Sequence, residues 1–170
     1  GGASEAAGRV AAAEADVQLF WGEPLDGVAE RIDRLRRLSE KTGRELPPLE
    51  FGLRVTTVVR DTAEEAWAEA ESRVARMARW REPDWSAAVG QRRLLDLAER
   101  GEVLDGHLYT APARYGGAGA GATWLVGSYE EVAAALRRYR DLGISHFILS
   151  DTPYLTELRR QGEHLLPLLR

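Results

Sequence analysis

The chain of 170 residues has the length of a single domain and can bury a core of ordinary size. Hydrophobic residues make up 44% of it and charged residues 29%, and its net charge of −4 gives no general attraction to nucleic acid or anionic membranes. It has no cysteine, which excludes disulfides, thiolate metal sites and a cysteine nucleophile within the chain, and it has neither an apolar run of about 18 residues nor a basic-then-apolar leader. We therefore expect a soluble, cytoplasmic protein that binds neither nucleic acid nor membranes.

The first eight residues, GGASEAAG, form a short turn of glycine and serine that enters a helix. Ser4 is a good N-cap, and the alanine-rich stretch that follows to Ala15 supports the helix. A Gly-Gly loop at a helix N-terminus leaves amide N–H groups free to hold an anion, which the helix dipole also favours. Because such short motifs are common, an ordinary capped helix start or a vector-derived segment is the simpler interpretation of the residues alone.

Strands alternate with helices over residues 16–79. Residues 16–21 (DVQLFW) and 49–60 (LEFGLRVTTVVR) have the apolar, β-branched composition of strands. Each is followed by apolar residues at helical spacing, over 25–38 and over 61–79. Alternation of this kind predicts a parallel α/β sheet.

Residues 80–122 interrupt the alternation. Pro83 and Asp84 predict the start of a helix that ends at Gly101, and residues 109–122 (YTAPARYGGAGAGA) form a loop rich in glycine and alanine. A loop with so few anchoring side chains is either a mobile lid over an active site or a passive linker. Its glycine repeat is not a dinucleotide-binding fingerprint, because it follows no predicted strand and opens no helix.

A helix with strong signals at both ends comes next. Ser128 and Glu131 form a capping box, so the helix should begin at Tyr129. Its apolar stripe ends at Leu142, and Gly143 stands where a left-handed C-cap is needed.

Residues 146–150 (HFILS) then predict a short strand buried on both faces. The next four residues, DTPY, leave the carboxyl end of that strand, where α/β proteins place their ligands. A last helix is predicted over residues 155–169.

The stretch VGSYEEVAAALRRYRDLGISHFILSDTPYL resembles the last helix, strand and helix of the bacterial-luciferase-like flavin monooxygenases. It is most similar to the alkanesulfonate monooxygenase group, whose chains end in a comparable "VG…E.VA…YRDLGI..FILS..P.L" pattern. The resemblance runs through residues 1–170 but corresponds to only the second half of such an enzyme. It implies an α/β fold: the C-terminal half of a (β/α)8 TIM barrel, with three parallel strands and an inserted helix and Gly-rich loop at about 80–122.

The resemblance also gives roles to the opening turn and to an arginine in the second strand. In the family a similar Gly-Gly-x-Ser turn holds the flavin phosphate, so Gly2, Ser4 and the amide of Glu5 are the expected cofactor-binding residues. Arg54 matches the arginine of an "FG-aliphatic-R" strand that faces flavin and substrate. From the residues alone, a guanidinium in an apolar strand must snorkel or find an anion, and a structural ion pair with a nearby carboxylate is the alternative.

Other matches concern the substrate. Arg114 matches the arginine of the family's "RGGAG" loop, which closes over the site and meets an anionic group of the substrate; a solvated loop arginine is the alternative. Trp21, in FWGEP, matches the tryptophan of a "TWGEP" segment and is expected to form an apolar wall beside substrate or flavin, unless it is a plain core aromatic. Thr56, Thr152 and Tyr154 stand where the alkanesulfonate enzymes have a histidine, a tyrosine and a histidine, so substrate contacts should differ there.

The implied activity of the intact protein is reduced-FMN-dependent monooxygenation, in which O2 reacts through a C4a-peroxyflavin and a small alkanesulfonate or related organosulfur compound is oxygenated. Arg54 and Arg114 are the expected catalytic residues, and a separate reductase is expected to supply the FMN. A half barrel leaves two sheet edges open, so we expect a homo-oligomer or pairing with a missing half. The alternatives are a non-catalytic flavin-binding or interaction module and a deazaflavin-dependent oxidoreductase. None of the three histidines has the spacing of a metal site.

Overall fold

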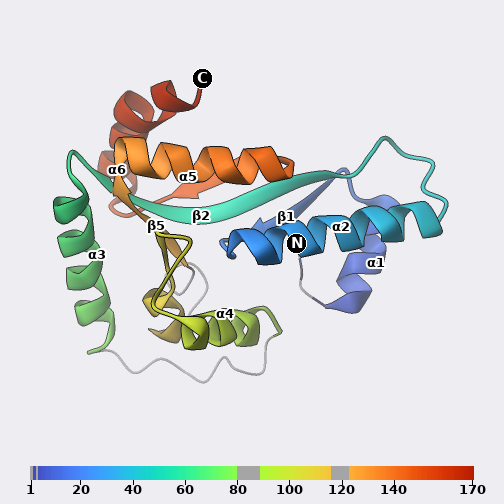
Figure 1. Cartoon of the computed structure of the whole chain (residues 1–170), viewed down its shortest axis with the longest axis horizontal. Helices are drawn as coiled ribbons and strands as arrows, with labels where there is room; N and C mark the ends of the chain where they lie inside the picture. The colour runs from blue at the N-terminus through green and yellow to red at the C-terminus, as the bar shows by residue number, and fades with distance from the viewer. Residues whose placement is uncertain (1, 3, 80–88, 116–122) are drawn as a thin grey trace.

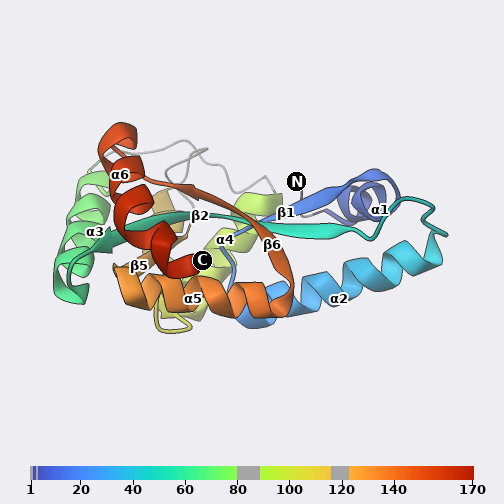
Figure 2. The same cartoon turned by 90° about the horizontal axis from the view of Figure 1, so that it is seen from above.

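The computed structural model describes residues 2, 4–79, 89–115 and 123–170. A long curled strand, β2 (Glu50–Arg60), runs through the molecule, and two helices, α2 (Leu25–Lys41) and α5 (Tyr129–Leu142), cover one face of its sheet (Figures 1 and 2). The other elements are, in chain order, α1 (Glu5–Glu14), β1 (Val17–Trp21), α3 (Ala63–Met77), α4 (Val89–Arg100), β3 (Val103–Leu104), β4 (Leu108–Tyr109), the 3-10 helix η1 (Ala111–Tyr115), β5 (Trp124–Ser128), β6 (Ile144–Ser150), α6 (Tyr154–Arg160), the π-helical turn η2 (Gln161–Leu165) and the 3-10 helix η3 (Leu166–Leu169).

Four parallel strands and a short antiparallel hairpin form the sheet. β1 pairs with residues 50–54 of β2 and β6 pairs with residues 51–56, so these two strands lie on opposite edges of β2. β5 pairs with residues 56–60 and meets β1 end to end, where the Thr123 hydroxyl donates to the Gly22 carbonyl. β4 and β3 continue the sheet from β5 in antiparallel fashion.

This strand order differs from that of a closed barrel, in which each strand pairs with the strands before and after it. The last strand, β6, pairs with β2 rather than with β5, and its second edge carries no strand within the described residues. The sheet is therefore a curled half barrel covered by helices. The expected fold, an α/β half barrel, is confirmed.

Two predictions about individual elements are wrong. The sequence predicted three parallel strands, but β5 is a fourth; its five residues, WLVGS, are too few to show periodicity and run straight into the next helix. The last strand was expected to be buried on both faces, yet in β6 only Ile144 is buried, and Ile148 is 43% exposed because no described element covers it. By contrast, the last helix extends over the expected residues: α6 ends at Arg160 and continues without a break as η2 and η3 to Leu169.

The two ends of α5 follow the sequence closely. The Ser128 hydroxyl accepts from the Glu131 N–H at 3.2 Å, and the Glu131 carboxylate accepts from the Ser128 N–H at 2.8 Å, so the capping box is complete. Gly143 ends the helix with a φ of 110°, a left-handed conformation that favours glycine. By contrast, the predicted helix start at Pro83 lies outside the described residues.

Alternate residues of β2 belong to different apolar clusters. Leu53, Val55 and Val59 pack in a core beneath α2 and α5, whose buried members include Ile32, Leu35, Leu136 and Tyr139. On the other face, Val58 packs beneath α3 in a smaller cluster with Ala66, Ala70, Trp124 and Val126. α3 thus covers the carboxyl end of β2 on this second face, and none of the described helices covers the middle of the strand there.

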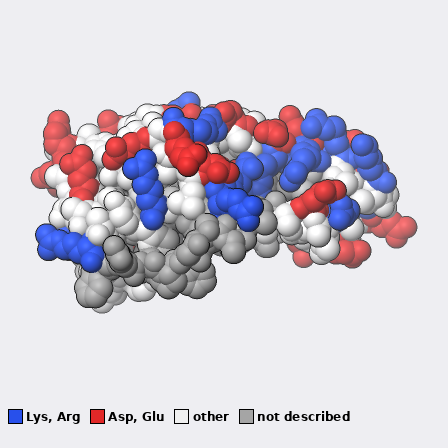
Figure 3. Space-filling view, turned by 90° about the horizontal axis from the view of Figure 1, so that it is seen from below, with Lys and Arg blue, Asp and Glu red and all other residues white. Residues whose placement is uncertain are grey.

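The surface of the described residues mixes both signs of charge. Arginine and lysine side chains are interspersed with aspartate and glutamate over the described part of the face in Figure 3. In the part of the chain that the structure covers, no helix has the length and apolar character needed to cross a bilayer.

Candidate active site

A hollow of about 900 Å³ opens on the second face of the sheet, between β2, the carboxyl end of β6, the segment that follows it and α3. Its wall includes Arg54 and Thr56 of β2 and, after β6, Thr152 and Tyr154. The structure thus brings together four residues that the sequence analysis expected near flavin or substrate. A volume of this size is typical of small-molecule sites, which range from roughly 300 to 1,000 Å³.

The register of the strands places these side chains on one face. Arg54 is paired with Trp21 of β1 on one side and with Ile148 of β6 on the other, and Thr56 is paired with Ser150. Laterally paired residues of parallel strands point to the same side of the sheet. Trp21, which is 38% exposed, therefore lies beside Arg54, next to the hollow, although it is not part of its wall.

Arg54 is an exposed cation between two buried neighbours, Leu53 and Val55. Within the described part of the chain its guanidinium forms no hydrogen bond or ion pair, so the alternative of a structural ion pair finds no support there. A strand fixes the backbone of this residue, and no carboxylate among the described residues neutralises its charge. The guanidinium is therefore available to an anionic ligand in the hollow.

The α3 side of the hollow carries a charged network that the sequence analysis did not find. The Arg73 guanidinium contacts Glu69 at 2.6 Å, contacts Asp151, and lies 3.6 Å from Glu157. Glu157 also pairs with Arg60, at the end of β2, at 3.2 Å. Because these ion pairs join α3 to β2, to the end of β6 and to α6, they hold the walls of the hollow in place.

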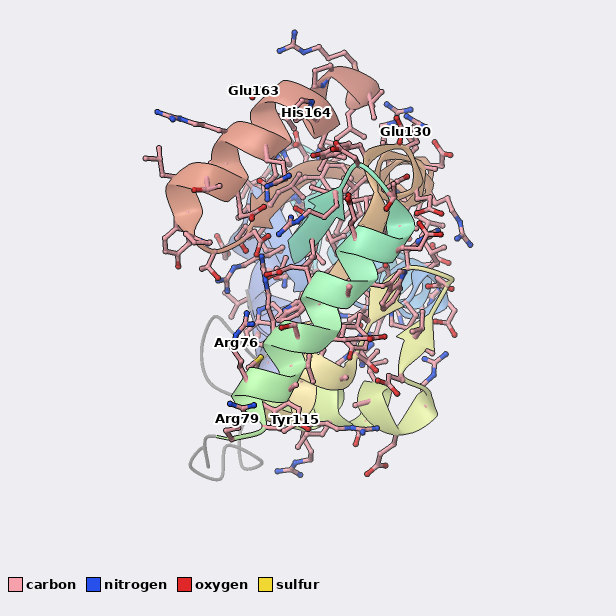
Figure 4. The ribbon with its side chains drawn as sticks, turned by 90° about the vertical axis from the view of Figure 1, so that its left-hand side faces the viewer. Arg76, Arg79, Tyr115, Glu130, Glu163 and His164 are labelled. Carbon is pink, nitrogen blue, oxygen red and sulfur yellow. The ribbon has the colours of Figure 1, made fainter. Side chains whose placement is uncertain are left out.

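Two further arginines project from the carboxyl end of α3. Arg76 lines the hollow, and Arg79, which Figure 4 shows beside it, does not. The Arg76 guanidinium donates to the Ser72 hydroxyl at 2.8 Å. Both side chains are exposed, which makes Arg79 a matched control for changes to arginines in the wall.

Asp151 begins the segment DTPY, which the sequence placed at the ligand-binding end of a strand, but the sequence analysis assigned this residue no role of its own. It follows β6 directly and is only 3% exposed, and its Oδ1 accepts from Arg73 and, at 2.7 Å, from the Thr152 N–H. Burial raises the pKa of this carboxyl group to about 6, against the opposite effect of Arg73 and of the Thr152 N–H. Its position at a strand end was the available signal, since ligands of parallel α/β proteins bind there.

The two partners of the Asp151–Arg73 pair respond differently to burial. On Arg73, burial lowers the pKa, but the bonds to Glu69 and Asp151 outweigh it and the pKa is raised. On Asp151, burial prevails. The difference follows from exposure and from the number of partners: the Asp151 side chain is 1% exposed, whereas that of Arg73 is 11% exposed and has two short carboxylate contacts.

The opening turn has the features of an anion site at the start of α1. Ser4 is the N-cap, and its exposed hydroxyl accepts from the Ala7 N–H at 3.2 Å. A Cβ on Gly2 would come within 2.7 Å of the Ala7 side chain, so the backbone there approaches the helix as closely as only glycine allows. Glu5 opens the helix, and its side chain pairs with Arg9. Phosphate binding at this turn stays a prediction, and the described contacts of these residues do not reach the hollow.

The turn is anchored beside the end of β1. Its Gly2 carbonyl accepts from Arg31 at 3.3 Å, and Arg31 in turn pairs with Glu23, which is buried just after β1. Arg93 of α4 contacts the same carboxylate at 2.6 Å. This buried cluster ties the start of the chain to the carboxyl end of a parallel strand, the side of the sheet where ligands bind.

Arg114 lies apart from the hollow. It belongs to η1, and its guanidinium donates to the Ala98 carbonyl at 3.0 Å, in the last turn of α4. The contact holds η1 against α4 and compensates a carbonyl at the helix end. The glycine-rich residues 116–122 of the expected lid lie outside the described residues, so closure of this loop stays a prediction.

The chain belongs to the luciferase-like monooxygenase family, since the model of that family, described as luciferase-like monooxygenase, matches residues 1–146. This bears out the resemblance at the level of the family. Membership of the alkanesulfonate group within it stays a prediction.

Solved structures share the fold over nearly the whole chain. The riboflavin lyase RcaE, solved with modified FMN and riboflavin, has a TM-score of 0.64 and 23% identity and covers 99% of this chain and 41% of its own. The EDTA monooxygenase EmoA of Chelativorans sp. BNC1 has a TM-score of 0.64 and 15% identity, over 99% and 44%. The coenzyme F420-dependent tetrahydromethanopterin reductase of Methanopyrus kandleri has a TM-score of 0.57 and 11% identity, over 96% and 48%. The chain therefore spans less than half the length of these proteins, and at such identities the likeness establishes the fold.

Proposed function

We propose that the protein containing this chain is a reduced-FMN-dependent monooxygenase that oxygenates an alkanesulfonate or a related small organosulfur anion. Membership of the luciferase-like monooxygenase family supports the reaction class. The observation that carries the choice of an anionic substrate is Arg54, whose guanidinium lies in the wall of a hollow of small-molecule size and has no partner among the residues that the structure describes. A sulfonate has three oxygens that such a group can bind in bidentate fashion.

The residues of the site would have different roles in binding substrate and cofactor. Arg54 would hold the oxyanion of the substrate or stabilise negative charge on the cofactor. Thr56 and Thr152 would offer hydroxyl groups to the substrate, while the exposed aromatic rings of Trp21 and Tyr154 would give it an apolar surface. When bound, reduced flavin supplies the reaction with O2, and the protein binds, orients and shields the reacting groups.

The cofactor phosphate would sit at the opening turn. The Ser4 hydroxyl and the amides of α1 near Glu5 are suited to hold it, and Gly2 lets the backbone approach closely. Arg114 would contribute only after the loop that follows it closes over the hollow, because its guanidinium is held by α4 in the present arrangement. A flavin reductase, O2 and a second copy of the chain are the partners that this function requires or favours, in the cytoplasm.

A deazaflavin-dependent oxidoreductase is the second candidate. It is favoured by the likeness to a coenzyme F420-dependent reductase, which has the same fold over 96% of the chain. The third candidate is a non-catalytic flavin-binding or interaction module with the same fold. Affinity for cofactors distinguishes the three.

The test is an anaerobic titration of the purified protein with reduced FMN, oxidised FMN and the deazaflavin. We expect reduced FMN to bind best, and we expect Ser4→Ala and Arg54→Ala each to weaken it by about tenfold, the value of one hydrogen bond to a charged group. Arg79→Ala, which removes an exposed arginine outside the wall, should leave the affinity unchanged. Preference for the deazaflavin would favour the second candidate, and binding of no flavin would refute the proposal.

Turnover provides the substrate test. With a reductase, O2 and a short alkanesulfonate, oxygenation at the carbon that bears sulfur should yield an aldehyde and sulfite, which is measured directly. Arg54→Ala should lose most of this activity, while a neutral thioether should be a poor substrate for the unchanged protein because it lacks the anion. Equal rates with sulfonate and thioether would contradict an anionic substrate.

A further inference from the structure

One oxygen of Asp151 is left without a partner inside the wall of the hollow. The side chain lies directly after β6 and lines the hollow, and the residue is 3% exposed. Its Oδ1 accepts from both Arg73 and the Thr152 N–H, whereas its Oδ2 is buried and has no hydrogen-bond partner among the described residues. Buried polar atoms are nearly always satisfied, so an unsatisfied one in the wall of a site calls for a ligand.

What Asp151 Oδ2 can bind depends on whether the carboxyl group is protonated. As a carboxylate, Asp151 would leave one buried oxygen with negative charge and no donor, which is costly. As the neutral acid it keeps Arg73 and the Thr152 N–H on Oδ1, and the proton goes to the free Oδ2, which then needs an acceptor. Burial favours this second state and raises the pKa of the group to about 6.

The charges that surround the hollow favour an acceptor with negative charge. Two guanidinium groups of its wall, Arg54 and Arg76, have no carboxylate partner within the described residues. The charged groups of the wall and of the ion pairs around Asp151 are Arg73 and Glu69 of α3, Glu157 and Arg160 of α6, Arg60 and Arg54 of β2, and Arg76 of α3. The first five pair with one another, which leaves Arg54 as the unpaired cation nearest in register to the end of β6.

We propose that Asp151 is a ligand-binding residue of the hollow and that it acts there as the neutral acid, with its Oδ2–H donating to an oxygen of the anion that Arg54 holds. The inference rests on the proposed function in one respect, namely that the ligand is an oxyanion. It adds that one wall of the site binds through a carboxylic acid. The anion therefore binds together with one proton, and an ionised Asp151 repels it.

Because the anion binds together with a proton, the proposal can be tested on the unchanged protein by measuring its affinity at different pH values. An alkanesulfonate stays fully ionised in neutral and mildly acid solution, so its own titration cannot affect the result. We expect the dissociation constant of ethanesulfonate, measured by calorimetry on the purified protein, to rise about tenfold for each pH unit above about 6, since the protonated fraction of Asp151 falls by that factor. Circular dichroism at each pH would show that the protein stays folded.

Two variants test whether Asp151 is the residue that binds this proton. Asp151→Asn keeps a neutral side chain with an N–H donor, so it should bind ethanesulfonate with an affinity that is independent of pH and close to that of the unchanged protein at low pH. Asp141→Asn removes the same charge from an exposed site on α5 and should keep the original pH profile. Asp151→Asn leaves every other charged side chain in place, so a pH dependence that disappears in this variant belongs to Asp151.

The possible failures are distinguishable. A pH-independent affinity of the unchanged protein, or a pH dependence that persists in Asp151→Asn, would overturn the role of Asp151 and leave the anion site at Arg54 intact, provided that Arg54→Ala still abolishes binding. Absence of ethanesulfonate binding at any pH would overturn both proposals together. If Asp151→Asn fails to fold, a flat profile of the unchanged protein still refutes the inference, and a tenfold fall per pH unit still supports it.

Discussion

The two faces of the central sheet differ in what they bury. On the face beneath α2 and α5, Leu53 and Val55 of β2 are completely or almost completely excluded from solvent and belong to a continuous apolar core. On the opposite face, their neighbours Arg54 and Thr56 line an open hollow whose far wall is a network of ion pairs. One strand thus contributes to stability with one set of alternate residues and to ligand binding with the other.

This division explains why polar groups are tolerated so close to the core. Alternation along a strand separates the two sets by the thickness of the sheet, so charge on one face costs the other little. It also indicates that changes on the covered face should affect unfolding, whereas changes on the open face should affect binding.

The largest effect is expected on the covered face. Leu136 of α5 is completely buried in the core, so Leu136→Ala should lower the free energy of unfolding by about 2 to 5 kcal/mol through lost burial and the cavity left behind. Denaturant unfolding measures this. Leu158 of α6 is 53% exposed, and Leu158→Ala should change the same quantity by less than about 0.5 kcal/mol. Similar losses in the two variants would mean that the covered face is not the stabilising one.

An intermediate effect is expected on the open face, as a dependence of stability on pH. The ordinary pKa of Asp151 is 3.8 and folding raises it to about 6, so folding favours the protonated form. This contribution is present at low pH and is lost as the pH rises through about 6; the shift of about two units corresponds to at most roughly 3 kcal/mol. Asp151→Asn, which cannot ionise, should therefore be more stable than the unchanged protein at about pH 7 to 8 and should show a flatter profile.

Comparison of the two proteins is needed because other groups oppose this trend. Bonds to Arg73 lower the pKa of Glu69, and a bond to Arg100 lowers that of Asp26, so both carboxylates lose their stabilising contacts in acid. Subtracting the two stability profiles isolates Asp151. If the difference in unfolding free energy between the two proteins is constant from about pH 4 to 8, Asp151 is ionised throughout. The open face would then lack the titrating group that we expect there.

The smallest effect is expected at the start of α5. Ser128→Ala removes the hydroxyl that accepts from the Glu131 N–H and should cost about 1 kcal/mol of unfolding free energy. Because the helix packs on the covered face, the affinity for ethanesulfonate should stay unchanged. If Ser128→Ala weakened ethanesulfonate binding without lowering the free energy of unfolding, the two faces would not have separate roles.

Local signals predicted much of the covered face. The capping box and Gly143 fix both ends of α5 through contacts within a few residues, and such contacts are visible in the sequence. The periodic apolar residues of α2 likewise predicted its buried side, with Val28, Ile32 and Leu35 in the core. The family resemblance, rather than periodicity, then suggested how these elements combine into a half barrel.

The open face was harder to predict because its features depend on distant contacts. The ion pair of Arg73 with Asp151 joins residues 78 positions apart, and no local pattern indicates it. The contact of Arg114 with Ala98 depends on how η1 packs against α4. The exposure of β6 depends on which elements cover it, so an apolar sequence alone suggested burial that the structure does not have. Arg54 could be recognised as unusual, yet only the structure shows that none of the described carboxylates pairs with it.

The most direct test of the account is a crystal structure of the protein with ethanesulfonate bound at about pH 5. The account predicts electron density for the sulfonate in the hollow, with its oxygens within hydrogen-bond distance of the Arg54 guanidinium and of Asp151 Oδ2. Sulfonate bound elsewhere, or an Arg54 guanidinium turned away from a ligand in the hollow, would contradict it.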